Sequence, residues 1–167
     1  MSDAASVTRF PGPEHDHDFC VEKALQNAVN ICRQRGLRFT AQRRRILELV
    51  WSSHKPVGAY DILELLARDG NSTAPPTVYR ALEFLINANL VHRLDSLNAF
   101  VGCPEPRTPH AGQFLICSQC RSVVELNEPD ISDVVRQKAD SLGFSASRLT
   151  LEIQGLCQLC QAQMRAE

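Results

Sequence analysis

Two pairs of cysteines in the last third of the chain have the spacing of a metal site. Cys117 and Cys120 form one Cys-x-x-Cys pair, Cys157 and Cys160 form a second, and 36 residues separate them. Four thiolates in this arrangement suit a tetrahedral zinc ion and fill its coordination shell, which leaves no position for water or a substrate. The spacing therefore predicts a structural zinc site that joins two distant segments.

The same cysteines could instead be redox-active or simply buried. A thioredoxin-type pair opens a helix after a strand, whereas we expect Cys117 to end a strand that turns into another strand. The chain shows neither an apolar leader at its start nor an apolar run of about 20 residues, so we expect a cytoplasmic protein without a membrane partner. Because disulfides are rare in the cytoplasm, metal binding is favoured.

A second group of possible ligands precedes the first cysteine pair. His92, Cys103 and His110 offer nitrogen and sulfur donors, which favour zinc over manganese or magnesium. A single histidine is usually a surface or packing residue, but these three flank a Pro-rich segment at which a ligand could couple two domains. A fourth donor is needed, and the spacing does not choose among Glu105, Glu125 and Glu128.

The N-terminal segment holds further possible ligands, His15, His17 and Cys20. Residues 1–17 show no periodicity, and we interpret them as a flexible tail, so specific metal binding there stays open. Cys32 falls on the apolar face of an expected helix, which places it in a core.

Charge is distributed unevenly along the 167 residues, whose net charge is −1. Residues 21–93 carry 11 basic and 6 acidic side chains, whereas residues 94–167 carry 6 and 9. The hydrophobic fraction of 44% suffices for a packed core. A basic first half on a nearly neutral protein indicates a domain that binds a polyanion, joined to a second domain with another task.

The apolar pattern of the basic half predicts four helices and a hairpin. We expect the first helix at 18–35, with Asp18 as its cap, and the second from Thr40, its cap, through at least Val50. A third should run from about 59 to 69, and residues 71–76 introduce a fourth, with Pro76 near its first turn. Residues 90–101 are typical of two short strands around a turn. This order makes residues 18–102 a winged helix-turn-helix, in which the third and fourth helices are the reading pair and the hairpin is the wing.

Two groups of side chains on these helices point to nucleic acid. On the fourth helix Arg80 lies opposite the apolar stripe, and Thr77 and Phe84 flank it. Three arginines occupy the early turns of the second helix, where basic charge opposes the helix dipole, so we expect them to serve something other than helix stability. They are Arg43, Arg44 and Arg45.

The second half changes character after residue 102. Residues 103–112 are rich in proline and are predicted to form a hinge. Residues 113–167 then predict a small α/β domain: strands at 113–117 and 121–126, a helix after 127, a strand around 149–153 and a short helix that holds Cys160. The whole chain is therefore expected to be α+β. A domain this small has little core, so we expect it to need both the zinc site and a partner subunit.

Several motifs resemble those of the ferric uptake regulator (Fur) superfamily. Residues 75–85, PPTVYRALEFL, are similar to its recognition-helix motif, and residues 37–43, LRFTAQR, and both cysteine pairs fit the same family. The resemblance covers the chain from about residue 19. Members that sense iron or peroxide carry a His-rich run ahead of the first cysteine pair, where this chain has Cys103-Pro-Glu-Pro. In this respect it resembles the zinc uptake regulator (Zur) branch.

The resemblance implies roles for individual residues. A regulatory zinc site would consist of His92, Cys103, His110 and Glu125. DNA contacts would come from Tyr60 and Arg80, with Thr77 and Tyr79 near the backbone. From the chemistry of the side chains themselves, we expect Arg80 to read guanine in the major groove and the basic side chains of Arg38, Arg43, Arg44 and Arg45 to neutralise phosphates.

The implied protein is a zinc-responsive repressor with two Zn²⁺ per chain, which binds a palindromic double-stranded DNA operator as a homodimer and represses zinc-uptake genes. It would not be an enzyme and would take no small-molecule substrate. A sibling regulator that senses iron, manganese or peroxide is the main alternative. A thiol oxidoreductase would need an exposed thiol of low pKa, and a zinc hydrolase would need an open coordination position, which the second ligand set offers if Glu125 stays away.

Overall fold

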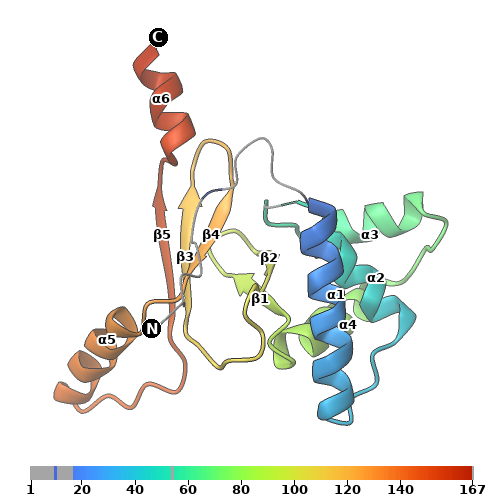
Figure 1. The fold of residues 1–167 in the computed structure, drawn as a ribbon, viewed down its shortest axis with the longest axis horizontal. Helices are drawn as coiled ribbons and strands as arrows, with labels where there is room; N and C mark the ends of the chain where they lie inside the picture. The colour runs from blue at the N-terminus through green and yellow to red at the C-terminus, as the bar shows by residue number, and fades with distance from the viewer. Residues whose placement is uncertain (1–9, 11–16, 54, 167) are drawn as a thin grey trace. The chain divides into compact units, whose positions relative to one another are not determined.

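The computed structural model describes residue 10, residues 17–53 and residues 55–166, and these form two compact units (Figure 1). The first unit ends at Pro109 and the second begins at His110, while Phe10 belongs to the second. This boundary lies inside the segment 103–112. The domain limits drawn from the sequence stay predictions. Among the described helices, none is both long and apolar enough to cross a lipid bilayer.

The first unit consists of four helices and a two-stranded antiparallel sheet. The helices are α1 (His17–Gln34), α2 (Ala41–Trp51), α3 (Ala59–Arg68) and α4 (Pro75–Asn87), and the strands are β1 (Val91–Leu94) and β2 (Ala99–Gly102). The hairpin register sets His92 opposite Val101. The predicted order of helices followed by a wing is confirmed.

Local sequence signals explain where these helices begin and end. The Thr40 hydroxyl accepts a hydrogen bond from the Arg43 backbone N–H at 3.3 Å and so caps α2. Gly36 and Gly70 follow α1 and α3 in the left-handed region, with φ of +64° and +76°. The predicted cap of α1 is wrong: Asp18 lies in the first turn of α1. Its negative charge still favours the positive end of the helix dipole.

The core of the first unit fixes the back of α4. Val78, Ala81, Leu82 and Leu85 of this helix are buried. They pack with residues of the other helices and the hairpin, including Leu25, Ala28, Ile31, Cys32, Ile46, Leu47, Val50, Ile62, Leu66, Val91 and Phe100. Burial of each large aliphatic side chain contributes about 1.5–3 kcal/mol. Because one face of α4 is held this way, the opposite face stays available at the surface.

The second unit is a three-stranded sheet with two helices. Its elements are β3 (Gly112–Cys117), β4 (Val123–Leu126), α5 (Pro129–Ser141), β5 (Thr150–Gly155) and α6 (Gln158–Ala166). The central strand β3 is antiparallel to β4 and parallel to β5 (Figure 1). The predicted element order is confirmed. The parallel pair was not predicted, and β4 begins at Val123 instead of Arg121 because residues 118–120 form a turn and Arg121 takes a left-handed conformation.

A buried amide docks the start of α5 on the sheet. The side-chain N–H of Gln113 donates to the Ser132 hydroxyl at 2.7 Å and to the Glu128 carbonyl at 2.9 Å. Beyond this contact, many large apolar side chains of the unit stay exposed, namely Ile131, Val134, Val135, Leu142, Phe144, Ile153, Leu156, Leu159 and Met164. Ile153 is 49% exposed, so the half-buried pattern predicted for β5 is not met within one chain.

A close approach of the wing to α2 gives a stability prediction. A Cβ atom on Gly102 would overlap the indole of Trp51, a rigid ring that cannot turn aside without moving the core. Gly102→Ala should therefore lower the free energy of unfolding of the first unit by about 1–3 kcal/mol. Trp51 is the only tryptophan in the chain, so its fluorescence during urea unfolding measures the loss directly.

The matched control is Gly155→Ala, also at a strand glycine. An added Cβ there meets no atom within 4 Å, so the midpoints by Trp51 fluorescence and by circular dichroism should stay in place. An unchanged midpoint for Gly102→Ala would mean that the close packing of β2 on α2 is absent in solution.

Candidate metal centres and nucleic-acid face

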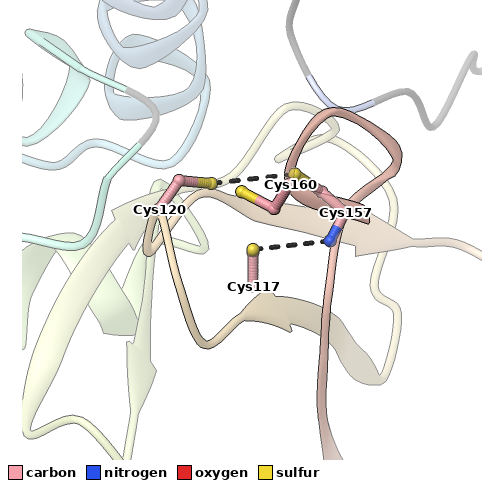
Figure 2. Close-up of side chains that lie close together, drawn as sticks. All are labelled: Cys117, Cys120, Cys157 and Cys160. Carbon is pink, nitrogen blue, oxygen red and sulfur yellow. Dashed lines mark hydrogen bonds between the residues drawn. The ribbon is translucent and has the colours of Figure 1, made fainter. Parts of the chain in front are cut away.

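Four cysteine sulfurs meet at one end of the second unit (Figure 2). Cys117 ends β3, Cys120 lies in the turn before β4, Cys157 follows β5, and Cys160 lies in α6. All four sulfurs are within 4.8 Å of one another. The Cys120 and Cys157 sulfurs are 3.8 Å apart. This equals the edge, roughly 3.8 Å, of a tetrahedron with Zn–S bonds of about 2.3 Å, so the set fits a zinc ion.

Backbone pairing explains why cysteines so distant in sequence converge. The parallel register sets Cys117 opposite Gly155, and the chain reaches Cys157 two residues later. The Ser118 N–H donates to the Gly155 carbonyl at 2.8 Å and ties the turn to the end of β5. Within the turn, Arg121 takes a left-handed conformation with φ of +62°, and its N–H donates to the Cys117 carbonyl at 2.9 Å. A slip of the parallel register would separate the two cysteine pairs.

Electrostatics at these thiols favour a bound cation. Burial disfavours the thiolate of Cys117, but backbone N–H groups, first that of Cys157, donate to its sulfur and lower its pKa to about 6. The hydrogen bond with the Ser122 hydroxyl lowers the pKa of Cys120. By contrast, burial and the neighbouring thiols raise the pKa of Cys160 to about 12. Without a cation the four thiols therefore cannot all be thiolates near neutral pH, whereas a divalent cation offsets their mutual repulsion.

The surroundings of the cluster do not suit redox exchange with another protein. Cys117, Cys157 and Cys160 are only 1–4% exposed. The half-buried ring of Phe10 also packs against these cysteines. Sequence reasoning placed Phe10 in the tail, and no periodic pattern could have signalled this contact. An exposed thiol of low pKa, which a thiol oxidoreductase needs, is not among these three.

Two residues of the second predicted set lie together in the first unit. His92 is in β1, and Cys103 follows β2 with its N–H donating to the Leu90 carbonyl at 3.0 Å. The antiparallel hairpin brings the ligand atoms of His92 and Cys103 within 4.8 Å of each other. Cys103 is 3% exposed. A nitrogen and a sulfur donor thus stand side by side at the base of the wing.

The other two residues of this predicted set, His110 and Glu125, lie together in the second unit. His110 precedes β3, and its Nε2 is 2.7 Å from Glu125 Oε1 on β4. Both side chains are nearly buried, 8% and 7% exposed. Of the three glutamates that the spacing left open, Glu125 is the one paired with this histidine, whereas Glu128 is exposed and precedes α5. The pair offers a nitrogen and an oxygen donor.

The predicted DNA-contacting side chains of α3 and α4 are at the surface. Arg80 is exposed on α4, Tyr79 is 45% exposed beside it, and Thr77 is half-buried one turn earlier. On α3, Tyr60 is 70% exposed. The outward direction of Arg80, inferred from helical periodicity, agrees with the burial of the opposite face of α4.

The arginines at the start of α2 have partners inside the protein. Arg44 pairs with Glu48 at 3.2 Å, and Arg45 reaches Glu48 at 3.1 Å and Asp69 at 2.9 Å. The expectation that they serve something other than helix stability is therefore incomplete. The spacing of Arg44 and Glu48, four residues apart, could have signalled the first pair, but nothing local signals the contact with Asp69. Arg38, in the loop before α2, is exposed.

The N-terminal candidates receive no support as a metal site. His15 lies outside the described residues, and the side chain of His17 is likewise not described. Cys20 is half-buried on α1 and belongs to none of the groups of possible ligands found among the described residues.

Known proteins are similar to this chain in sequence and in fold. The Zinc uptake regulation protein of Escherichia coli (strain K12) is 36% identical over 140 residues, which cover 83% of this chain and 82% of that protein. The Peroxide-responsive repressor PerR of Staphylococcus aureus (strain Mu50 / ATCC 700699) is 28% identical over 144 residues, 84% of this chain and 94% of the relative.

Two similar solved structures are a zinc uptake regulator complexed with zinc and DNA and the protein XcZur in its holo form. The first has a TM-score of 0.82 and 34% identity, and the match covers 88% of this chain and 98% of the regulator's chain. The second has a TM-score of 0.78 and 40% identity, and the match covers 88% of this chain and 99% of the XcZur chain. Residues 34–154 match the model of the Ferric uptake regulator family. The chain belongs to the Ferric uptake regulator family.

Proposed function

We propose that this protein is a zinc-responsive transcriptional repressor, which binds palindromic DNA operators as a homodimer and represses zinc-uptake genes. The similarity to zinc uptake regulators, one of them in complex with zinc and DNA, supports this function. One observation carries the zinc response: His92 and Cys103 stand side by side at the base of the wing. A nitrogen–sulfur pair selects zinc over manganese and magnesium.

The cysteine cluster would hold the first zinc ion permanently. A zinc ion bound to four thiolates has no open coordination position and no redox chemistry of its own. The thiols would then link the β3–β4 turn to the end of β5 and the start of α6. A unit whose described apolar side chains are largely exposed gains most from such a link.

A second zinc ion would be held by His92 and Cys103 from the first unit and by His110 and Glu125 from the second. Each pair supplies two donors, so both pairs are needed for a tetrahedral shell. Ligation by both pairs would restrict the relative orientations of the two units. Protein without it would sample many orientations, and its apparent affinity for two half-sites would fall by the fraction of competent molecules.

The exposed face of α4 would read the DNA. A guanidinium on a helix in the major groove can donate two hydrogen bonds to guanine O6 and N7, which suits Arg80. Tyr60 would also contact the DNA, and Thr77 and Tyr79 would lie near the DNA backbone. Arg38, Arg44 and Arg45 would face phosphates, and ion pairs at exposed sites are weak enough for DNA to compete with them.

The exposed apolar side chains of the second unit support a homodimer. Val134 on α5 is 65% exposed, Phe144 64% and Met164 on α6 58%. Apolar side chains in such number mark a surface that another subunit covers. A symmetric dimer presents two copies of α4 and therefore requires an operator with two related half-sites.

The alternatives have weaker support. The peroxide-responsive relative is 28% identical, below the 36% of the zinc uptake regulation protein. Buried thiols disfavour a thiol oxidoreductase, and Glu125 would close the position that a zinc hydrolase needs open. That the protein is not an enzyme, and that it is cytoplasmic, stay predictions.

Removal of one thiolate tests the structural site. Cys157→Ser should leave one tightly held zinc fewer per chain and weaken the dimer, because an incomplete shell cannot hold its segments together. Elemental analysis and light scattering measure both effects. Cys20→Ser is the control, since Cys20 lies outside the cluster, and it should keep two zinc ions per chain. A stable, fully metallated Cys157→Ser dimer would refute the structural assignment.

Removal of the sulfur donor at the wing tests the sensor. Cys103→Ser should keep the zinc ion of the four-cysteine cluster and the dimer, but its DNA affinity should no longer depend on free zinc. Binding is measured on a duplex that the wild-type protein selects from random sequences, in titrations with Zn²⁺, Fe²⁺ or Mn²⁺. If Cys103→Ser retains the zinc dependence, or if the wild-type protein responds better to iron or manganese, the sensor assignment is wrong.

Truncation of the reading side chain tests the DNA face. Arg80→Ala should reduce discrimination between the selected duplex and a random one by about 1–3 kcal/mol, the worth of a bidentate base contact. Arg148→Ala removes the same charge from an exposed site on the other unit and should leave discrimination unchanged. Undiminished discrimination in Arg80→Ala would exclude Arg80 from reading bases.

A further inference from the structure

Arg43 makes contacts unlike those of its neighbours in the basic cluster. Its guanidinium carbon lies 3.6 Å from the centroid of the Phe84 ring. One N–H of the same guanidinium donates to the backbone carbonyl of Arg38. The side chain is half-buried, and its own backbone N–H bonds to Thr40, the cap of α2. Arg43 is thus held between the loop before α2, α2 itself and the ring of α4.

The ring that Arg43 covers lies next to the proposed reading residue. Phe84 follows Arg80 by four residues on α4, and side chains at this spacing are neighbours on one helix face. Phe84 is half-buried and borders the core cluster of the first unit. Arg43 therefore reaches the DNA-facing side of α4 and not its buried back.

We propose that Arg43 is a positioning residue for the recognition helix, which sets α4 for base reading by stacking on Phe84, and not a phosphate ligand. This inference rests on the proposed DNA-binding function. A guanidinium is planar and weakly hydrated, so it can stack on an aromatic face while it donates in its plane, which an ammonium cannot do. The carbonyl of Arg38 fixes that plane, and the ring of Phe84 lies against it.

The two roles of Arg43 predict different effects on salt dependence. A phosphate ligand contributes about 0.9 to the slope of log affinity against log salt, and it does so for operator and random DNA alike. A positioning residue contributes little to this slope but changes how well the reading helix fits its bases. It therefore affects operator affinity and leaves affinity for random DNA in place.

The experiment compares Arg43→Lys, Arg43→Gln and Phe84→Leu in the full-length, zinc-loaded protein. Affinities for the duplex selected by the wild-type protein and for a random duplex are measured over a salt series. Positioning predicts that all three variants lose about three- to ten-fold in affinity for the selected duplex, the worth of a cation–π contact. They should keep the wild-type salt slope and the wild-type affinity for random DNA.

Other outcomes overturn the inference. A phosphate role predicts that Arg43→Gln loses about 0.9 of the slope on both duplexes, that Arg43→Lys keeps it, and that Phe84→Leu behaves as the wild type. A wild-type protein that selects no duplex from random sequences would refute the proposed function itself. These results differ, so the two failures are distinguishable.

A measurement without DNA tests the stack on its own. Urea unfolding followed by Trp51 fluorescence gives the stability of the first unit in Arg43→Lys, Phe84→Leu and the double variant. If Arg43 and Phe84 hold each other, the double variant loses less than the two single losses combined. Additive losses would show that the stack does not hold α4 in solution and would overturn the inference.

Discussion

The parallel pairing of β3 with β5 is the constraint on which the second unit depends. Among the described residues, this pairing brings residues near 117 beside residues near 155, and so it gathers the four thiols. The pairing of β3 with β5 in turn depends on the metal-linked thiols, because a short sheet with an exposed edge strand has little else to hold its far end. Backbone N–H groups stabilise the thiolate of Cys117 despite its burial, whereas burial and the neighbouring thiols raise the pKa of Cys160 to about 12. A structural cation is the physical solution to this conflict.

The proposed regulation follows from how the remaining donors are divided. One pair belongs to the winged helix-turn-helix unit and the other to the sheet unit. Neither pair alone completes a tetrahedral shell, so tight binding of a metal ion would require both units. The free energy of metal binding would then restrict the orientation of one unit relative to the other. In this way a metal ion that makes no DNA contact can change the affinity for DNA. The closed thiolate set, by contrast, belongs to one unit and suits permanence.

Much of this was predictable from the sequence because the signals are local. The Thr40 cap, the glycines after α1 and α3, and the apolar stripe of α4 each specify an element from a few neighbouring residues. The Cys-x-x-Cys spacing likewise predicted a cluster whose sulfurs do converge. The unpredicted features are long-range. Neither the parallel register of β5 nor the contact of Phe10 with the cysteines leaves a trace in local periodicity.

The basic cluster of α2 shows the same limit at the level of single side chains. Its charge suggested one shared task, yet Arg43 stacks on Phe84 of α4 while Arg45 pairs with Asp69, the residue that follows α3. Asp69 and Phe84 are 24 or more residues away in sequence from these two arginines, so local spacing reveals the pair of Arg44 with Glu48 but neither of these contacts. Residue type and spacing predicted a DNA-binding face, but only the tertiary contacts show that its arginines have different partners.

Zinc K-edge X-ray absorption of the native dimer tests the central claim most directly, namely that a permanent thiolate site and a separate mixed-donor site coexist in each chain. With two zinc ions per chain, one bound by four sulfurs and one by a single sulfur, the average should be about 2.5 sulfurs per zinc at roughly 2.3 Å, with nitrogen or oxygen at roughly 2.0–2.2 Å for the rest. Chelation of the weaker ion should raise the average to about four. One zinc per chain with four sulfur ligands, and DNA binding intact in that state, would contradict the account.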